Sequence, residues 1–429
     1  MADANDQGSA IYQPIDLARV EPEENRLDDY GFEGLTYDPT GANLQGAVGD
    51  HGNGFLNDAD IADQAVDWLS IRSRAEQPWC LTVSFVNPHD HEFFWAGTEF
   101  ERYNAAFTDQ TLAPFTNYSY WDGVYYPPVV RWEENPLKSP PSYGYPEVPP
   151  NWERGAELKA NKPSTQTFAR VFQGAVWGAV ADDRVDNSIS IAAYPTSTTL
   201  GIATAPFSYW QRSLDLYTQT MTMVDQHIGR VVDTLPADIA AKTVIVFRSD
   251  HGDYTGAHGF VFGKVGSMHN EAYHVPLIVV DGTGRFTSDT DIVREGLTSS
   301  VDMLGLLVSL GHHGTREWIR GDLVEPYSQR HDMIPMLRFA RASGRPYVLL
   351  VDEEQVPKIY NFNDCPSHIV GVRTAQNKFG LYAHWIRGTT QAIPRISSRN
   401  SMTIRPSEDD WNATTLPVTR GCRRYATRC

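Results

Sequence analysis

The sequence predicts an α/β fold, because apolar strands and amphipathic helices alternate along the chain. Two apolar runs, at residues 244–247 and 275–280, are separated by a polar, glycine-containing stretch. Directly before them, residues 206–235 carry apolar side chains at steps of three and four, which predicts a helix that Pro236 ends. In α/β proteins, ligands bind at the carboxyl ends of the strands, so we expect a site in the turn that follows residue 247.

Composition limits the class of partner. The chain has 429 residues, of which 41% are hydrophobic, which is enough for a large core and a smaller lobe. Its formal net charge is −17, and because nucleic-acid binding needs a surplus of Lys and Arg we expect no nucleic-acid partner. A small anion can still bind where cations gather locally. The sequence has no apolar run that could span a bilayer and no signal peptide, so we expect no membrane span, while cytoplasmic and periplasmic locations both stay open.

The first part of the chain is predicted to be mostly loop, with one helix and one strand. Residues 1–57 are rich in Gly, Asp and Asn, which favour turns. The apolar stripe of residues 58–69 predicts a helix. The run 80–86 is almost wholly apolar, which is typical of a strand covered on both faces, and we expect Cys80 to be a buried thiol in it. His89 lies in the turn that follows this strand.

Aromatic residues and prolines dominate residues 91–165. Long aromatic loops line pockets or pack over surfaces, so Trp95 is a candidate both for a substrate pocket and for simple packing. Further along, residues 299–307 predict an amphipathic helix, and three short alternating runs within 335–385 predict a small antiparallel sheet.

We therefore expect three parts. Residues 1–330 form the α/β domain, and residues 331–385 form a small C-terminal lobe around the antiparallel sheet. Residues 386–429 are rich in Arg, Ser and Thr without an apolar period, which predicts an irregular tail.

The turn after residue 247 carries the clearest chemistry. Asp250 and His251 offer a carboxylate oxygen and an imidazole nitrogen side by side, a donor pair that suits a divalent cation. The alternative is that Asp250 caps the turn and His251 is a surface histidine. Lys264 follows on a glycine-bearing segment, where its ammonium group can hold an anion; an exposed lysine without such a role is the alternative.

Four pieces of this region resemble, in order and spacing, the sulfatases of the alkaline phosphatase superfamily. They are Ser-Asp-His-Gly-Asp at 249–253, Gly-Ala-His-Gly at 256–259, Gly-Lys at 263–264, and the run from Asn270 to Val279. The resemblance extends from about residue 28 to about residue 385. It implies an alkaline-phosphatase-like three-layer αβα sandwich with a small C-terminal α+β lobe, and cleavage of small sulfate monoesters at a divalent-metal site.

The resemblance also implies roles for individual residues. Asp250 and His251 would be metal ligands, and Lys264 would contact a sulfate oxygen. His89 would bind the ester oxygen or protonate the leaving group. His258, His269 and Trp95 would surround the metal or line the substrate pocket. Many sulfatases carry Asn in place of His251, whereas the Asp-His pair resembles the choline-sulfatase and phosphonate-monoesterase branch; calcium is the expected ion, with manganese or magnesium as alternatives.

The sequence departs from the family at its beginning. Sulfatases open with a strand that ends in two adjacent aspartates, followed by Cys-x-Pro-Ser-Arg or its Ser variant, whose first residue becomes the formylglycine nucleophile. Neither motif occurs here, and the echo Asp-Cys-Pro-Ser-His at 364–368 lacks the arginine. We therefore expect an N-terminally truncated sulfatase with no nucleophile of its own and no activity alone. A phosphonate or phosphodiester hydrolase of the same superfamily and a non-catalytic sulfatase-like protein are the alternatives; the alcohol of the ester and the oligomeric state stay open.

Overall fold

The protein is described from a computed structural model, which defines residues 47–48, 58–89, 91, 120–121, 124–125, 129–130, 145, 147–176, 179–183, 190–193, 201–205, 207–264, 266–287, 293–353, 365–366, 368–384 and 401–404. The chain divides into two compact units. The first comprises residues 1–149 and 171–236, and the second comprises residues 150–170 and 237–429. The segment 331–385 belongs to the second unit together with the strands that precede it.

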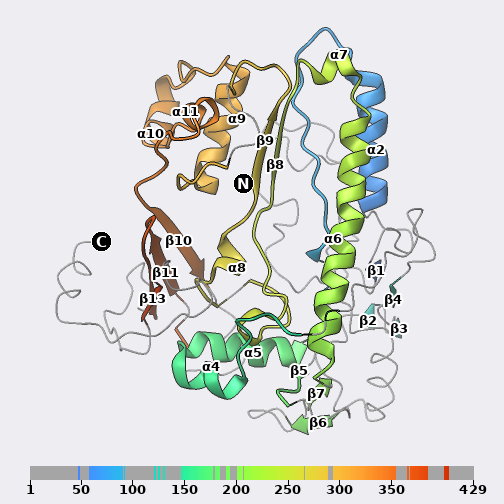
Figure 1. The fold of residues 1–429 in the computed structure, drawn as a ribbon, viewed down its shortest axis with the longest axis vertical. Helices are drawn as coiled ribbons and strands as arrows, with labels where there is room; N and C mark the ends of the chain where they lie inside the picture. Colours follow the sequence, from blue (N-terminus) through green and yellow to red (C-terminus); the bar gives the residue numbers. More distant parts are fainter. Residues whose placement is uncertain are drawn as a thin grey trace, which may run out of the picture. The chain divides into compact units, whose positions relative to one another are not determined.

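Two long helices dominate the first unit. They are α2 (Asp58–Arg72) and α6 (Tyr209–Asp233), which lie side by side (Figure 1) and confirm the helices predicted from the apolar periods. An ion pair between Arg230 of α6 and Asp63 of α2 links their exposed sides. None of the helices in the described part of the chain combines the length and the apolar character that a bilayer span requires.

Short strands complete the described part of the first unit. β1 (Ala47–Val48) pairs in parallel with β4 (Val129–Val130), and β2 (Tyr120–Trp121) pairs antiparallel with β3 (Val124–Tyr125). A three-stranded sheet has β7 (Gly201–Ala205) at its centre, parallel to β5 (Ala179–Val180) and antiparallel to β6 (Ser190–Ala193).

The run 80–86, predicted as a doubly covered strand, has no sheet partner among the described residues. Its side chains alternate between exposed and half-buried, and Cys80 is exposed rather than buried. An apolar run becomes a strand only where a neighbouring backbone completes its hydrogen bonds. Here the end of the run is held by a side chain instead, because the buried Asp58 carboxylate accepts the amides of Val86 and Asn87 at 2.7 and 3.0 Å.

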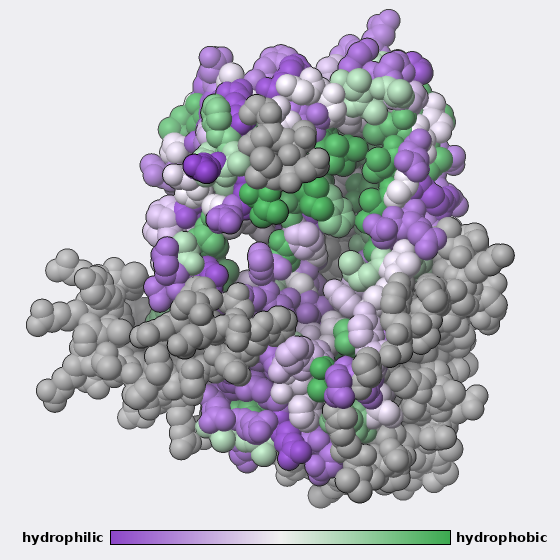
Figure 2. All heavy atoms as spheres, viewed as in Figure 1, coloured by the Kyte–Doolittle hydropathy of each residue, from purple (hydrophilic) through white to green (hydrophobic). Residues whose placement is uncertain are grey.

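In the second unit, β8 (Val244–Arg248) and β9 (Leu277–Asp281) form an antiparallel ribbon, which confirms both predicted strands. One face of the ribbon packs on a core contributed by α9 (Met303–Gly311) and α11 (Ile334–Arg338). On β9 the alternate residues Ile278 and Val280 are each 54% exposed, and hydrophobic residues reach the surface along this ribbon (Figure 2).

The remaining helices of the second unit are short. Two adjoin the loop that follows β8, namely α4 (Gly155–Asn161) and α5 (Ser164–Val176), of which α5 continues past residue 170 into the first unit. The others, in chain order, are α7 (Ala237–Ala240), η7 (Ala257–Gly259), α8 (Asn270–Tyr273), η8 (Ser300–Asp302), α9 (Met303–Gly311), η9 (Gly321–Leu323), α10 (Val324–Tyr327) and α11 (Ile334–Arg338). The helix predicted at 299–307 is therefore present as η8 followed by α9.

The C-terminal antiparallel sheet is confirmed and is larger than predicted. β10 (Val348–Glu353), β11 (His368–Arg373) and β12 (Lys378–Ala383) pair in sequence order. A fourth strand, β13 (Ser401–Ile404), pairs with β12 within the segment predicted as an irregular tail. Four residues are too few to show a strand period in the sequence, so pairing with β12 defines this strand.

Candidate active site

The turn after β8 brings Asp250 and His251 together. The Asp250 carboxylate accepts the His251 backbone amide at 2.8 Å through Oδ1, and its Oδ2 lies 3.5 Å from His251 Nε2. The Asp250 side chain is 77% exposed and that of His251 34%. Asp250 thus caps the turn with one oxygen and presents the other to the imidazole, and its role as a metal ligand stays a prediction.

The orientation of the His251 ring suits metal coordination. Its Nδ1 lies 3.0 Å from the carbonyl oxygen of Gly252. A carbonyl oxygen only accepts, so Nδ1 carries a proton, and Nε2, which faces Asp250, is the ring nitrogen that can bind an ion after losing its own proton. A backbone carbonyl on the other ring nitrogen is the usual way in which a protein orients a histidine ligand. The carboxylate and imidazole therefore fit a divalent cation as a donor pair.

Glycine is required immediately after the pair. A Cβ at position 252 would lie 1.9 Å from the carbonyl oxygen of Glu271. The Gly252 amide also donates to the carbonyl of Ala272 at 2.9 Å. Close backbone contact with α8 thus fixes the start of the loop that leaves the pair.

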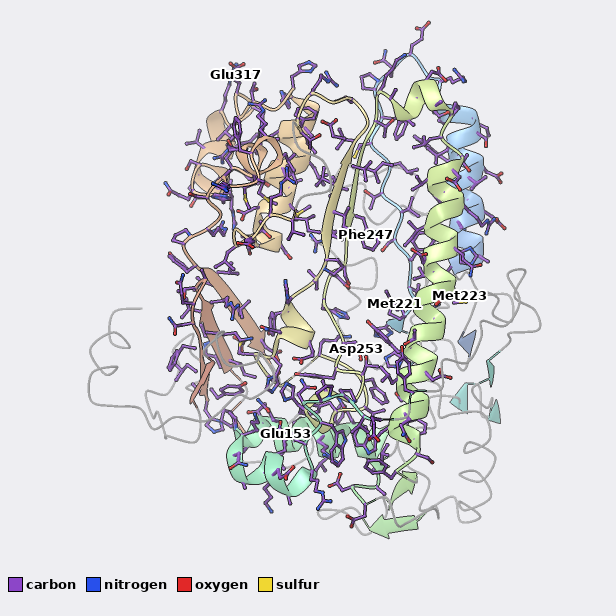
Figure 3. All side chains as sticks on the ribbon, viewed as in Figure 1. Glu153, Met221, Met223, Phe247, Asp253 and Glu317 are labelled. Carbon is purple, nitrogen blue, oxygen red and sulfur yellow. The ribbon has the colours of Figure 1, made fainter. Side chains whose placement is uncertain are left out.

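The two ends of the loop 253–263 are then joined by hydrogen bonds, and Lys264 follows the second end. Asp253 accepts the Gly263 amide at 2.9 Å through Oδ2, and the Tyr254 amide donates to the Gly263 carbonyl at 3.1 Å. Asp253 lies beyond the carboxyl end of β8, which carries Phe247 (Figure 3). Lys264 follows the closure directly and is half-buried.

Asp250 interacts electrostatically with both His251 and Lys264. Burial acts to raise the pKa of Asp250, but the charge of His251, hydrogen bonds from the backbone and the charge of Lys264 outweigh it and lower this pKa. Asp250 is therefore an anion at neutral pH, as a metal ligand must be.

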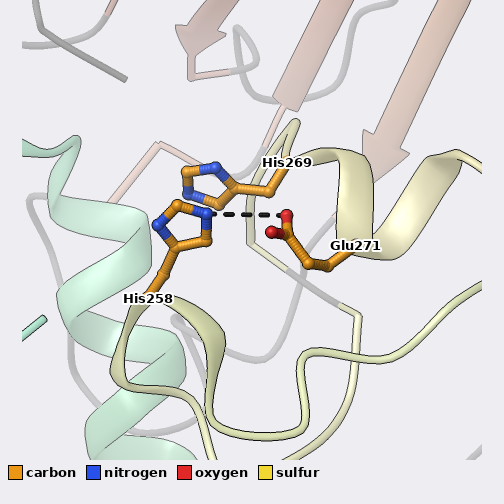
Figure 4. A group of neighbouring side chains, drawn as sticks. All are labelled: His258, His269 and Glu271. Atoms are coloured by element: carbon orange, nitrogen blue, oxygen red, sulfur yellow. Dashed lines mark ion pairs between the residues drawn. The ribbon is translucent and has the colours of Figure 1, made fainter. Parts of the chain in front are cut away.

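A second group of donors lies in the same unit. His258, His269 and Glu271 each place one ligand atom within 4.8 Å of the others, which is close enough to hold a metal ion. Figure 4 shows the two imidazole rings stacked on each other and a dashed line between His258 and Glu271. The line joins His258 Nε2 to Glu271 Oε2, which are 3.5 Å apart. Both histidines are buried, at 1% exposure each. The two histidines of this group are thus far less exposed than the Asp250–His251 pair, while the Glu271 side chain keeps 20% of its surface exposed.

The two buried histidines have opposite protonation tendencies. Burial acts to lower the pKa of His258, but its hydrogen bonds to the accepting carboxylates of Glu153 and Glu271 outweigh burial and raise this pKa. For His269, burial, together with the charge of His258, lowers the pKa well below its usual range. His269 is therefore neutral, and its Nε2 lies 3.1 Å from Gln166 Oε1.

The structure unites some of the predicted site residues and separates others. Asp250, His251 and Lys264 form one group, and His258 and His269 form the other. His89 belongs to the first unit, where its amide donates to the Val86 carbonyl at 3.2 Å, and its catalytic role stays a prediction. Trp95 lies outside the described residues.

Glu153, Lys162 and Gln166 were not identified from the sequence. Glu153 contacts His258 and Gln166 contacts His269 across 105 and 103 positions in the chain, and Lys162 pairs with Glu153. No local pattern in the sequence links such distant segments. The only available signal was Pro-Pro-Asn-Trp at 149–152, directly before Glu153, which resembles a proline-containing family motif.

The described part of the chain is an α/β protein with a carboxylate and an imidazole side by side beyond the end of a strand. The sulfatase family model matches residues 18–312, so the chain belongs to the sulfatase family. It is 24% identical over 263 residues to the uncharacterized sulfatase YidJ of Escherichia coli, an alignment that covers 61% of this chain and 37% of that protein. It is 29% identical over 134 residues to the multifunctional alkaline phosphatase superfamily protein PehA of Trinickia caryophylli, covering 30% of this chain and 22% of that protein.

Solved structures show the same fold. A putative sulfatase from Bacteroides thetaiotaomicron superposes with a TM-score of 0.51 at 16% identity, covering 86% of this chain and 61% of that one. The phosphonate monoester hydrolase SpPMH of Silicibacter pomeroyi superposes with a TM-score of 0.50 at 16% identity, covering 94% of this chain and 65% of that one. The chain therefore has the alkaline-phosphatase-like fold, and it spans less than two thirds of the length of each of these four proteins.

Proposed function

We propose that this chain carries the metal and anion side of a hydrolase that cleaves sulfate monoesters. The observation that carries the proposal is the Asp250–His251 pair, in which a carboxylate oxygen and the imidazole Nε2 face each other 3.5 Å apart at a strand end. The charge of Lys264 acts on the same carboxylate. A cation held by the pair and an ammonium group beside it would together bind a dianionic or monoanionic oxyanion.

Each residue has one role in this proposal. Asp250 and His251 hold the ion, which when bound polarises the oxyanion. Lys264 neutralises a non-bridging sulfate oxygen. His89 donates a proton to the leaving oxygen or binds it. We assign the nucleophile to no residue of this chain, and Cys365 is unsuited to the role because it is 4% exposed.

Calcium is the first candidate for the ion, by resemblance to the family. The imidazole donor also suits manganese, because nitrogen ligands are less typical of calcium than of transition metals. Formylglycine stays an expectation for the family that no motif in this sequence supplies.

A second candidate function is hydrolysis of phosphonate esters. It is favoured by the likeness in fold to a phosphonate monoester hydrolase and by the similarity to PehA. Phosphonate and sulfate esters share tetrahedral oxyanion centres, so the same ion and lysine would serve both.

Binding experiments test the proposal on this chain directly. Calorimetry with Ca²⁺ and with Mn²⁺ should show one site in the wild type, and Asp250→Asn should weaken it by more than about a hundredfold, since even residues behind a metal ligand contribute 10–100-fold. The control is Asp322→Asn, which removes an exposed carboxylate of η9. Equal ion affinity in the wild type and Asp250→Asn would reject the assignment.

Comparing the binding of two anions distinguishes the sulfate-ester function from the phosphonate-ester function. In the presence of the ion, inorganic sulfate and phenylphosphonate should both bind, and Lys264→Met should weaken both. Tighter binding of sulfate favours the sulfate-ester function, and tighter binding of phenylphosphonate favours the second candidate.

A further inference from the structure

In the buried group around His258, charged side chains pair with one another, as in an ionic cluster. His258 donates from Nδ1 to Glu153 Oε2 at 3.0 Å, and its Nε2 faces Glu271 Oε2 at 3.5 Å. Carboxylates accept only, so Nδ1 carries a proton. Nε2 lies between Glu271 and the amide nitrogen of Asn151, which is 3.3 Å away, and the two carboxylates that raise the pKa of His258 favour a second proton there and thus an imidazolium. Lys162 lies 3.4 Å from the other oxygen of Glu153. Two cations and two anions are therefore matched in one buried cluster.

The stacking of the two histidine rings also disfavours a shared ion. The ring centroids of His258 and His269 lie 3.6 Å apart with an interplanar angle of 15° (Figure 4). The lone pair of an imidazole lies in the ring plane, and metal–nitrogen distances are about 2.1 Å. An ion in the plane of one ring would consequently lie far out of the plane of the other.

His258 has a backbone conformation that is unfavourable for a residue other than glycine. Its φ is 54°, in the left-handed region that favours glycine. Such a conformation persists where surrounding contacts determine it. Here the His258 amide donates to the Asn151 carbonyl at 3.0 Å, and at the neighbouring Gly259 a Cβ would lie 2.2 Å from the Glu153 carbonyl oxygen.

His258 stands at the tip of the loop that ends in Lys264. The base of the loop is closed by Asp253 and Gly263, while the tip is joined to residues 151–162 through Glu153. Apolar packing of Tyr254 and Phe260 against Leu158 and Ala169 also holds the loop to this segment. Apolar packing is non-directional, whereas the two charged hydrogen bonds of His258 specify one orientation.

We propose that His258 is a positioning residue, whose paired contacts with Glu153 and Glu271 fix the loop 252–264 and so hold Lys264 beside Asp250, and that it is no metal ligand. The inference rests on the proposed function for the role of Lys264 and Asp250. The fixing of the loop does not depend on that function and can be measured separately.

Hydrogen–deuterium exchange tests the fixing of the loop. In His258→Gln, amides of peptides covering 252–264 should exchange about tenfold faster than in the wild type, since the loop opens locally, while peptides of β10–β12 stay unchanged. Unchanged exchange in 252–264 overturns the inference. If His258→Gln does not fold, Glu153→Gln carries the same comparison, because it removes one of the two anionic partners and keeps the shape of the side chain.

Two lysine substitutions test whether the loss of any positive charge near the loop would increase its exchange. Lys162→Met removes the buried cation paired with Glu153, and Lys159→Met removes an exposed cation from the adjacent helix α4. Faster exchange of 252–264 in Lys162→Met alone supports the cluster as the origin of the effect. Equal effects of the two substitutions overturn it.

Ligand binding then separates the two histidine groups. His258→Gln should keep one Mn²⁺ site while its affinity for inorganic sulfate falls about tenfold, because a displaced Lys264 loses its geometry. Asp250→Asn should lose the Mn²⁺ site. Loss of Mn²⁺ in His258→Gln with retention in Asp250→Asn would make the buried cluster the metal site and overturn the inference. If the wild type binds neither Ca²⁺ nor Mn²⁺, the proposed function fails, and the exchange measurement still decides the role of His258.

Discussion

The Asp250–His251 pair and the His258 cluster contain the same kinds of group in opposite environments. In the first, the carboxylate side chain is 77% exposed and that of the histidine 34%. In the second, the side chain of His258 is 2% exposed, and those of Glu153 and Glu271 are 22% and 20% exposed. Solvent competes for the first pair and leaves it open to an incoming ion. The second must satisfy its charges internally, so it stabilises the loop.

This contrast predicts different energies for the two groups. Exposed ion pairs contribute about 0–1 kcal/mol, whereas removing one partner from a buried charged group costs about 3–5 kcal/mol. The same substitution of a charged group by a neutral one should therefore have large effects on stability in the cluster and small effects at the pair.

The largest expected effect is that of His258→Gln. It removes the imidazolium from between two carboxylates. Because these carboxylates are partly exposed to solvent, we expect the free energy of unfolding to fall by about 3 kcal/mol, the lower limit of the range for buried charged groups. Urea denaturation followed by circular dichroism measures it. A loss below about 1 kcal/mol would place the cluster in the same energetic class as the exposed pair.

The second effect concerns the ion. At an ion concentration of one hundred times Kd, the wild type should gain about 2.7 kcal/mol in unfolding free energy, because the ion binds the folded state alone. Asp250→Asn should match the wild type in stability without the ion within about 1 kcal/mol and should gain nothing from it. Thermal unfolding with and without Mn²⁺ provides the comparison; an equal shift in both proteins would contradict it.

The lysine pair gives a smaller difference. Lys162→Met leaves Glu153 with one cationic partner and should lower the free energy of unfolding by about 1–2 kcal/mol. Lys159→Met should change it by less than about 0.5 kcal/mol, because this side chain is exposed. Similar losses in both variants would show that burial of Lys162 is irrelevant.

The smallest effect is a pH dependence of the cluster, in which Glu153, Glu271, Lys162 and His269 surround His258. The pKa of His258 is raised above its ordinary 6.5, so its contribution is fully present below 6.5 and is lost as pH rises through the raised value. The pKa values of Glu153 and Glu271 lie below their ordinary 4.5, so their contribution is present above 4.5 and is lost as pH falls through the lowered values.

The difference in stability between the wild type and His258→Gln should therefore be largest between about pH 4.5 and 6.5 and should shrink as pH rises further. Denaturation curves at several pH values measure it. A difference that grows toward alkaline pH would mean that His258 is neutral in the folded protein.

Prediction from the sequence succeeded where the signal is local. The helices α2 and α6, the ribbon of β8 and β9, and three strands of the C-terminal sheet follow from periods of neighbouring residues. The strand predicted at 80–86 was wrong, because the apolar character of a run says nothing about whether another backbone pairs with it. The strand β13 was missed for the converse reason, since pairing with β12 creates a strand from four residues without a clear period.

The sequence by itself determined the family motif and the adjacency of Asp250 and His251, because these are relations between neighbours in the chain. Only the tertiary structure decided that Asp253 closes the loop before Lys264 and that Glu153 meets His258 from 105 positions away. Differences in burial place similar side chains in either a solvent-exposed pair or a largely buried ionic cluster. Burial depends on segments that are distant in sequence, which no local pattern records.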